Sequence, residues 1–98
     1  MRIGQLTMTG SLQRISPDTQ NTVGGGYNIV CSVLQFQNNG SSQMRIGDNT
    51  TTANRGQIIL PGGGLYTAPV PPKGTRLCDW YVIGTASDVL DYLYETAE

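Results

Sequence analysis

Three carboxylates near the C-terminal end, Asp88, Asp91 and Glu95, are close enough in the sequence to be considered as catalytic groups. Asp88 with Asp91, or Asp91 with Glu95, could meet in space, and two carboxylates can divide the acid and base roles of glycoside hydrolysis. A solvated acidic strand at the edge of a sheet explains the same residues, because charged side chains on an edge prevent unwanted strand pairing. We favour the edge strand over a small glycan hydrolase and predict no catalytic residues.

The sequence contains no histidine, which removes the commonest general base and the usual partner of a nucleophilic Ser or Cys. The protein is therefore predicted not to be an enzyme. Asp18, Asp48 and Asn49 offer oxygen ligands for a hard cation, but without the spacing of a calcium loop. Cys31 and Cys78 fit no zinc or redox motif and are predicted to be free, buried thiols. No metal and no cofactor are expected.

Four aromatic residues, Trp80, Tyr81, Tyr92 and Tyr94, cluster towards the C-terminal end. Exposed aromatic rings can form a platform for sugars. The alternative is structural, with Trp80 and Tyr81 anchoring a turn into the core and with Tyr92 and Tyr94 half-buried in a strand. We favour the four residues as aromatic anchors.

The charged residues are divided along the chain. All six basic residues precede Asp79, whereas five of the seven acidic residues lie at or beyond it. Pairing within one subunit is favoured, and the alternative is contact between basic and acidic patches of neighbouring subunits. The candidate inter-subunit contacts are Arg45, Asp48, Arg55, Lys73, Arg76, Asp91 and Glu95.

Arg45, Asp48 and Arg55 form one further constellation, because a hairpin and the loop after it could bring an arginine and a carboxylate together. Such a pair would pin the loop, or one arginine would reach a carboxylate on a neighbouring subunit.

The net charge of -1 gives no general attraction to nucleic acid or to an anionic membrane. No apolar stretch approaches the length of a membrane span, and the first residues do not resemble a signal peptide. We therefore expect neither nucleic acid nor membrane as a partner, and synthesis in a cytosol.

The elements that position these residues are predicted to be short strands, because Gly, Pro and Asn clusters interrupt the sequence about every ten residues. This spacing is typical of one antiparallel β-sandwich over residues 1–98, jelly-roll or immunoglobulin-like, with about seven to eight strands. The expected strands are 4–15 in two halves with a bend at Gly10, a central strand at 27–37, then 43–48, 57–60, 65–68, 81–83 and 89–95, with a single turn at 77–80.

The connections carry their own signals. Residues 16–27 are polar and glycine-rich and are expected to form a mobile surface loop. Asn38 to Gly40 should supply the positive φ angles of a tight hairpin. Residues 69–76 should be an extended, Pro-rich connector. Segment 89–95 fits either a strand or a short helix, and its tyrosines favour the strand.

Several stretches together resemble a group of small tailed-bacteriophage virion proteins. They are "VLQFQNN" at 33–39, "RIGD" at 45–48 with Arg55 and Gly56 nearby, "PGGGL" at 61–65, and "WYVIGTASDVLDYLYE" at 80–95. In that group an apolar strand ends in Gln-Asn-x-Gly, a returning strand carries the Arg-Ile/Val-Gly-Asp box, and a Leu-rich acidic strand closes the chain. The resemblance covers roughly residues 28–95.

The resemblance implies a capsid decoration or cement protein that binds the outside of the major capsid protein shell and stabilises it. Its partners would be the major capsid protein and further copies of itself, with a trimer favoured at symmetry points of the shell. The protein would reside on the capsid surface of a virion assembled in the host cytoplasm. The alternative is a head-fibre or tail-associated module that binds host-surface glycan through the aromatics and residues 24–27.

Overall fold

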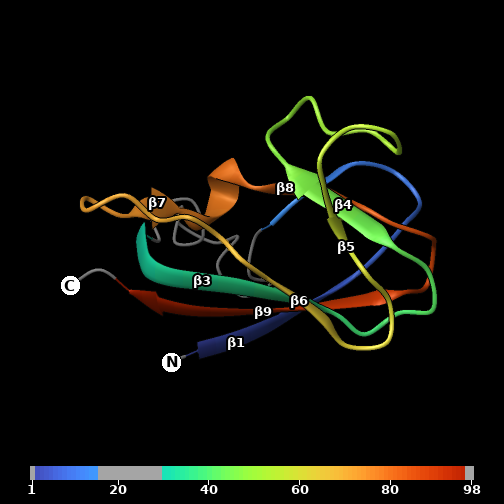
Figure 1. Ribbon diagram of the computed structural model, residues 1–98, viewed down its shortest axis with the longest axis horizontal. Helices are drawn as coiled ribbons and strands as arrows, with labels where there is room; N and C mark the ends of the chain where they lie inside the picture. Colours follow the sequence, from blue (N-terminus) through green and yellow to red (C-terminus); the bar gives the residue numbers. More distant parts are fainter. Residues whose placement is uncertain (1, 16–29, 97–98) are drawn as a thin grey trace, which may run out of the picture.

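The chain folds into two antiparallel β-sheets in the computed structural model, which describes residues 2–15 and 30–96 apart from the side chains of Arg2 and Cys78 (Figure 1). The loop predicted at 16–27 lies outside the described residues. In chain order the described elements are β1 (Arg2–Thr7), β2 (Gln13–Arg14), β3 (Val30–Asn38), β4 (Met44–Gly47), β5 (Gln57–Ile59), β6 (Gly64–Thr67), β7 (Thr75–Arg76), the 3-10 turn η3 (Leu77–Asp79), β8 (Tyr81–Ile83) and β9 (Val89–Thr96).

Sheet A has the order β1-β9-β3-β6, with the short β7 also paired to β3, and sheet B has the order β2-β8-β4-β5. Figure 1 shows two layers, with β1, β9, β3 and β6 of sheet A below and β8, β4 and β5 of sheet B above them. This arrangement confirms the predicted all-β antiparallel sandwich. The described residues form nine strands instead of seven or eight, and the additional strand is β7.

The core lies between the sheets and follows from the alternation of side chains along each strand. Every second residue of the long strands points inward, and each large apolar side chain buried in this way contributes about 1.5–3 kcal/mol. Sheet A supplies Leu34, Phe36, Leu90, Tyr92 and Tyr94, sheet B supplies Met44, Ile46, Ile59 and Val82, and Met8 and Ile15 flank β1 and β2.

Segment 89–96 is a strand, as favoured, and Leu90, Tyr92 and Tyr94 share its buried face. The prediction of an acidic edge strand is wrong, because β9 lies between β1 and β3 inside sheet A. Its length and its apolar inner face give it two strand partners, and its acidic residues are left on the outer face of the sheet. Asp91 therefore does not protect an edge.

The predicted hairpin at Asn38 to Gly40 is also wrong. Strand β3 belongs to sheet A and β4 to sheet B, so this turn carries the chain from one sheet to the other. The only non-glycine residue with positive φ in the described part of the chain is Ser87, and Gly40 is not among the positive-φ glycines. The physical reason is the buried side chain of Asn38 at the end of β3, which bonds to Gly40 and Ser42 in the turn and to Ile59 of sheet B and replaces hairpin pairing.

Strand β3 is the central strand of the prediction. A strict alternation along it would put Cys31 and Val33 on one face and Leu34 on the other. A register irregularity between Cys31 and Val33 breaks that alternation. Cys31 is consequently buried on the same side as Leu34, whereas Val33 is 39% exposed. A bulge of this kind inserts a residue and moves the side chains before it to the other face.

The segment at 69–76 is not extended throughout. The Gly74 amide donates to the Pro71 carbonyl at 2.8 Å and closes a turn, after which β7 pairs with Val30 and Cys31 of β3. The single turn predicted at 77–80 is η3, closed by the Trp80 amide on the Leu77 carbonyl.

Candidate functional site

The outer side of sheet A is an open, mostly uncharged surface, which we call the amide face. The strand registers align its side chains in rows across the four strands. Ile3 is 71% exposed, Leu65 59% and Val33 39%, so apolar groups stand in solvent between the amides. The amide face consists of Ile3, Gln5 and Thr7 of β1, Val89, Asp91, Leu93 and Glu95 of β9, Val33, Gln35 and Gln37 of β3, and Leu65 and Thr67 of β6.

Side-chain hydrogen bonds hold the polar groups of the amide face in place. The Asp91 carboxylate accepts from the Gln5 amide at 3.0 Å and from the Asn39 amide at 2.6 Å. The Gln35 amide donates to the Thr67 hydroxyl at 3.1 Å. These bonds tie neighbouring strands together and leave the apolar side chains between them free to contact another molecule.

The carboxylates considered for catalysis have structural partners instead. Asp91 is held by the side-chain amides of Gln5 and Asn39. Asp88 lies in the turn before β9, where its carboxylate accepts from the backbone N–H of Ser42 at 3.1 Å and faces the Ser41 hydroxyl at 3.4 Å. Glu95 lies exposed near the end of β9. Asp88 therefore joins the turn before β9 to the turn between β3 and β4, and Asp91 organises the amide face.

Asp48 and the two arginines near it do not form the predicted arginine–carboxylate pair. The Arg45 guanidinium donates to the Gly56 carbonyl at 3.0 Å, and its buried Nε has no hydrogen-bond partner within the described ranges. Asp48 accepts from the backbone N–H of Thr50 at 2.8 Å and from its hydroxyl. These bonds lower the pKa of Asp48, and the charge of Arg55 lowers it further. The constellation therefore pins the loop after β4, mainly through Thr50.

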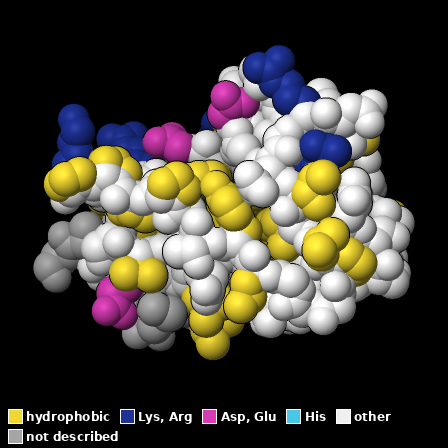
Figure 2. All heavy atoms as spheres, in the orientation of Figure 1, with side chains coloured by type: hydrophobic (Ala, Val, Ile, Leu, Met, Phe, Trp, Pro, Cys, Tyr) yellow, Lys and Arg dark blue, Asp and Glu magenta, His cyan; other side chains and the backbone are white. Residues whose placement is uncertain are grey.

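The basic residues lie away from the amide face. Arg55 is exposed in the loop after β4, Lys73 is exposed in the turn before β7, and Arg76 is exposed on β7. Figure 2 shows basic side chains over β7 and over the loop above β4, on the side of the molecule opposite β1 and β9. The predicted inter-subunit residues therefore do not form one surface. Asp91 and Glu95 belong to the amide face. The others lie on β4 and in the loop after it, which hold Arg45, Asp48 and Arg55, and around β7, which holds Lys73 and Arg76.

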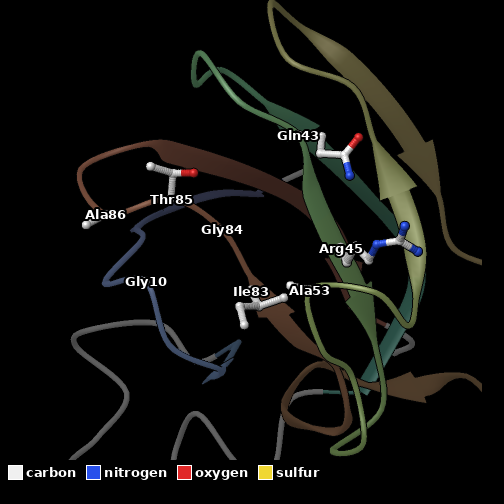
Figure 3. A pocket seen from close by; sticks show the side chains of 8 residues that line it. All are labelled: Gly10, Gln43, Arg45, Ala53, Ile83, Gly84, Thr85 and Ala86. Carbon is white, nitrogen blue, oxygen red and sulfur yellow. The ribbon is translucent and has the colours of Figure 1, made fainter.

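A pocket of about 420 Å³ opens beside Arg45 on sheet B (Figure 3). Arg45 is the only charged residue among those that line it, and Figure 3 shows its guanidinium pointing towards β5, away from Thr85 and Ala86. Arg45 was among the residues predicted from the sequence to make contacts. The residues of the β8–β9 turn that line the pocket opposite it were not predicted. The lining residues are Gly10, Gln43, Arg45, Ala53, Ile83, Gly84, Thr85 and Ala86.

Trp80 lines another pocket, of about 230 Å³. The other lining residues are Gly47, Asp48, Thr75 and Asp79. Its indole N–H donates to the Thr75 hydroxyl at 3.2 Å. The other side of the ring packs on the core, with its centroid 5.7 Å from that of Phe36 and 6.4 Å from that of Tyr66. Trp80 thus anchors the η3 turn and also borders a cavity that contains two carboxylates.

The four predicted aromatic anchors do not form one platform. Tyr81 is half-buried under Arg14, whose Nε donates to its hydroxyl at 3.0 Å. Tyr92 and Tyr94 are 1% and 6% exposed and stack with ring centroids 6.0 Å apart, so the expectation that they would be half-buried is wrong. Gly4 makes this burial possible, because a Cβ there would lie 2.2 Å from the Tyr92 ring.

The fold and these surfaces define an antiparallel β-sandwich protein with an exposed, amide-rich sheet face. No family model, curated protein or solved structure matches this chain. Among residues 2–15 and 30–96, no group of three or more Cys, Asp and Glu side chains could hold a metal ion. No helix in the same ranges is long and apolar enough to cross a membrane.

Proposed function

We propose that this protein is a virion structural protein of a tailed bacteriophage, which binds the outside of the major capsid protein shell and stabilises it. The resemblance at 33–39, 45–48, 61–65 and 80–95 supplies the class of protein. The amide face supplies the surface that such a protein needs. Catalysis is not part of the proposal.

The amide face carries the proposal because its composition suits contact with another protein. The cores of protein interfaces are depleted of charged residues, and large apolar side chains dominate their energy. Ile3, Leu65 and Val33 offer apolar area that gains about 25 cal/mol per Å² when water is removed. The amides between them can pair with the backbone of a partner.

Pre-organisation further supports a docking role. Gln5 and Gln35 are already held by hydrogen bonds to Asp91 and Thr67 across neighbouring strands. Binding would therefore cost little additional side-chain entropy, at about 0.5–1.5 kcal/mol per flexible side chain ordered. The resemblance implies a trimer, in which each subunit would make a weak contact with the shell. These weak contacts would add up through avidity.

The test is binding of the purified protein to shells that lack it. Leu65→Glu would place an unpaired charge in the contact and is expected to weaken binding at least about tenfold, or about 1.4 kcal/mol. Ile58→Glu is the matched control, because Ile58 is 39% exposed on β5 of the other sheet and lies opposite Arg45.

The second readout is shell stability. Shells that carry the protein should withstand heating or chelators better than shells that lack it, and shells with the Leu65→Glu protein should behave like bare ones. The proposal fails if wild-type protein does not bind shells and leaves their heat resistance unchanged.

A second candidate function is a head-fibre or tail-associated module that binds host-surface glycan. The observation in its favour is the pocket at Trp80, because an indole ring beside carboxylates matches the stacking and hydrogen bonding that sugars require. Trp80 is the only tryptophan, so its fluorescence reports this pocket directly. Glycan-array binding with quenching at Trp80, together with no affinity for shells, would favour this function over the first.

A further inference from the structure

Strand β1 is an edge strand with one open side. In the described part of the chain it pairs only with β9, and Figure 1 shows it at the outer margin of sheet A. The Met8 amide donates to the Asp88 carbonyl at 2.7 Å, so the backbone groups of even-numbered residues face β9. Because these groups alternate along an antiparallel strand, those of Ile3, Gln5 and Thr7 face away from β9.

The side chain of Gln13 already occupies one end of this open edge. Its Nε2 donates to the Thr7 carbonyl at 3.1 Å, and its Oε1 accepts from the backbone N–H of Thr9 at 3.0 Å. The amide of Gln13 thus imitates a short paired strand at this end. The backbone groups of Ile3 and Gln5 lie beyond its reach.

This edge lacks the devices that usually prevent strand addition. Proteins protect edges with charged residues, proline or bulges. The register of β1 with β9 runs without irregularity from Arg2 to Thr7, and the strand contains no proline. Its one charged residue is Arg2, at the end away from Gln13. Ile3 stands 71% exposed beside the open groups.

We propose that a second copy of this chain pairs with this edge, β1 against β1 in antiparallel orientation about a two-fold axis. We choose the register in which Ile3 of one copy lies opposite Gln5 of the other. It pairs the open backbone groups of both residues and keeps the bond from Gln13 to the Thr7 carbonyl. Gly4 then lies on the axis. Sheet A continues across the contact into the sheet of the second copy. The N–H and C=O groups of Ile3 meet those of Gln5 of the second copy, and those of Gln5 meet Ile3.

The charges and side chains fit this register. Arg2 of one copy lies opposite Leu6 of the other, so the two arginines are kept apart. On the amide face, Ile3 gains Gln5 of the second copy as its neighbour, in addition to Leu93 on its own β9. A contact of three residues per copy is smaller than a standard interface, so we expect a dissociation constant of about 10 µM to 1 mM.

This inference does not rest on capsid binding, and it differs from the trimer that the resemblance implies. The test is sedimentation of the purified protein over a concentration series. Wild type is expected to pass from monomer to dimer. Gln5→Pro removes the side-chain bond to Asp91 and an outward N–H, and an edge strand tolerates proline at such a position. It should weaken the dimer at least about tenfold.

Gln5→Ala is the matched control, because it loses the same contact with Asp91 but keeps the backbone N–H. It should associate like wild type. Wild-type protein that stays monomeric to about 1 mM, or a dimer or trimer that Gln5→Pro does not affect, would overturn the proposal.

Hydrogen exchange in the wild-type protein is a second measurement that needs no variant. The amides of Ile3 and Gln5 should exchange more slowly as the protein concentration rises, whereas the Leu65 amide, on the far edge of sheet A, should show no concentration dependence. Equal exchange of Ile3 and Gln5 at all concentrations would also overturn the proposal. Shells do not enter either experiment, so its failure is distinct from failure of the proposed function.

Discussion

The side-chain amide of Asn38 donates to the backbone carbonyl of Ile59 at 2.9 Å and so joins the end of β3 in sheet A to β5 in sheet B. The same amide nitrogen donates to the Ser42 carbonyl at 2.9 Å, and the side-chain oxygen accepts from the Gly40 amide at 2.8 Å. Asn38 has no exposed surface. One buried polar side chain therefore holds the crossing between the two layers.

Asn38→Ala should lower the free energy of unfolding by about 2–4 kcal/mol, because it leaves the buried Ile59 carbonyl and the partly buried Ser42 carbonyl and Gly40 N–H without this partner. Urea denaturation followed by circular dichroism measures this loss. Asn39→Ala is the control. The exposed side chain of Asn39 donates a hydrogen bond to Asp91, so removing this side chain should cost less than about 1 kcal/mol. Equal losses for the two variants would contradict the role assigned to Asn38.

The strands were predictable because one face of each is buried. The period of two along a strand puts Met44 and Ile46 on one side of β4, and Leu90 with Tyr92 on one side of β9, and all four side chains are buried. The path between strands was not predictable from the same signals. Asn-Asn-Gly has the local chemistry of a hairpin, and only the tertiary partners of Asn38 turn it into a crossing between sheets.

Some residues of the candidate site could be recognised in the sequence, but the way in which the fold brings them together could not. Asp91 was recognised, but its position on an outer sheet face depends on β9 pairing with both neighbours. The roles of Gln5 and Gln13 could not be predicted from the sequence. Their side-chain amides bond to neighbouring strands and to an open edge, and the partners are known only once the strand order is known. The bulge in β3 also has no signal in the sequence. Strict alternation would put Cys31 and Val33 on the same side, whereas the structure buries Cys31 and exposes Val33.

Cys31 should resist thiol reagents while the protein is folded. It has no exposed surface, and burial raises the pKa of its thiol to about 11. At pH 8 the thiolate fraction is therefore about 100-fold smaller than for a thiol with the ordinary pKa of 9.0. The measurement is the rate of reaction with a disulfide reagent in a Cys78→Ser variant, which leaves Cys31 as the only thiol.

The control for Cys31 is the same variant in concentrated guanidinium, where reaction should be at least about 100-fold faster. Rates that differ by less than about tenfold would mean that the β3 bulge does not keep this thiol inside the core.

Asp48 should make stability depend on pH in the acid range. The bonds from Thr50 lower the pKa of the folded protein below the ordinary value of 3.8. A lowered pKa means that the stabilisation is fully present above 3.8 and is lost as the pH falls through the folded value. Asp48→Asn should therefore be less stable than wild type near neutral pH, and the difference should shrink below pH 3.8.

Chemical denaturation of both proteins across the acid range measures this difference, and a carboxyl titration by NMR locates the pKa itself. Thr50→Val is the control variant, because it removes the hydroxyl donor and keeps the backbone N–H. It should move the pKa of Asp48 part of the way back towards 3.8. A wild-type Asp48 that titrates at or above 3.8 would contradict the loop geometry.

Ser87 lies in a strained turn that a glycine should relieve. Its φ is +79°, in the left-handed region, and the Asp88 amide donates to the Thr85 carbonyl at 3.0 Å across the turn. The backbone N–H of Ser87 also donates to the carbonyl of Met8, the residue that follows β1, at 2.9 Å, and this bond fixes the strained conformation. An L-residue in this region costs about 1–2 kcal/mol, and the greater unfolded entropy of glycine offsets about 0.5–1 kcal/mol of the relief.

Ser87→Gly is therefore expected to stabilise the protein by about 0.5–1 kcal/mol, which raises the melting temperature by several degrees in a domain of this size. Ala86→Gly is the matched control at the neighbouring position, where φ is not positive, and it should destabilise by a similar amount. Opposite signs for two adjacent glycine substitutions can arise only from the backbone. Two changes of the same sign would mean that the turn between β8 and β9 is relaxed, and that Met8 does not impose its conformation.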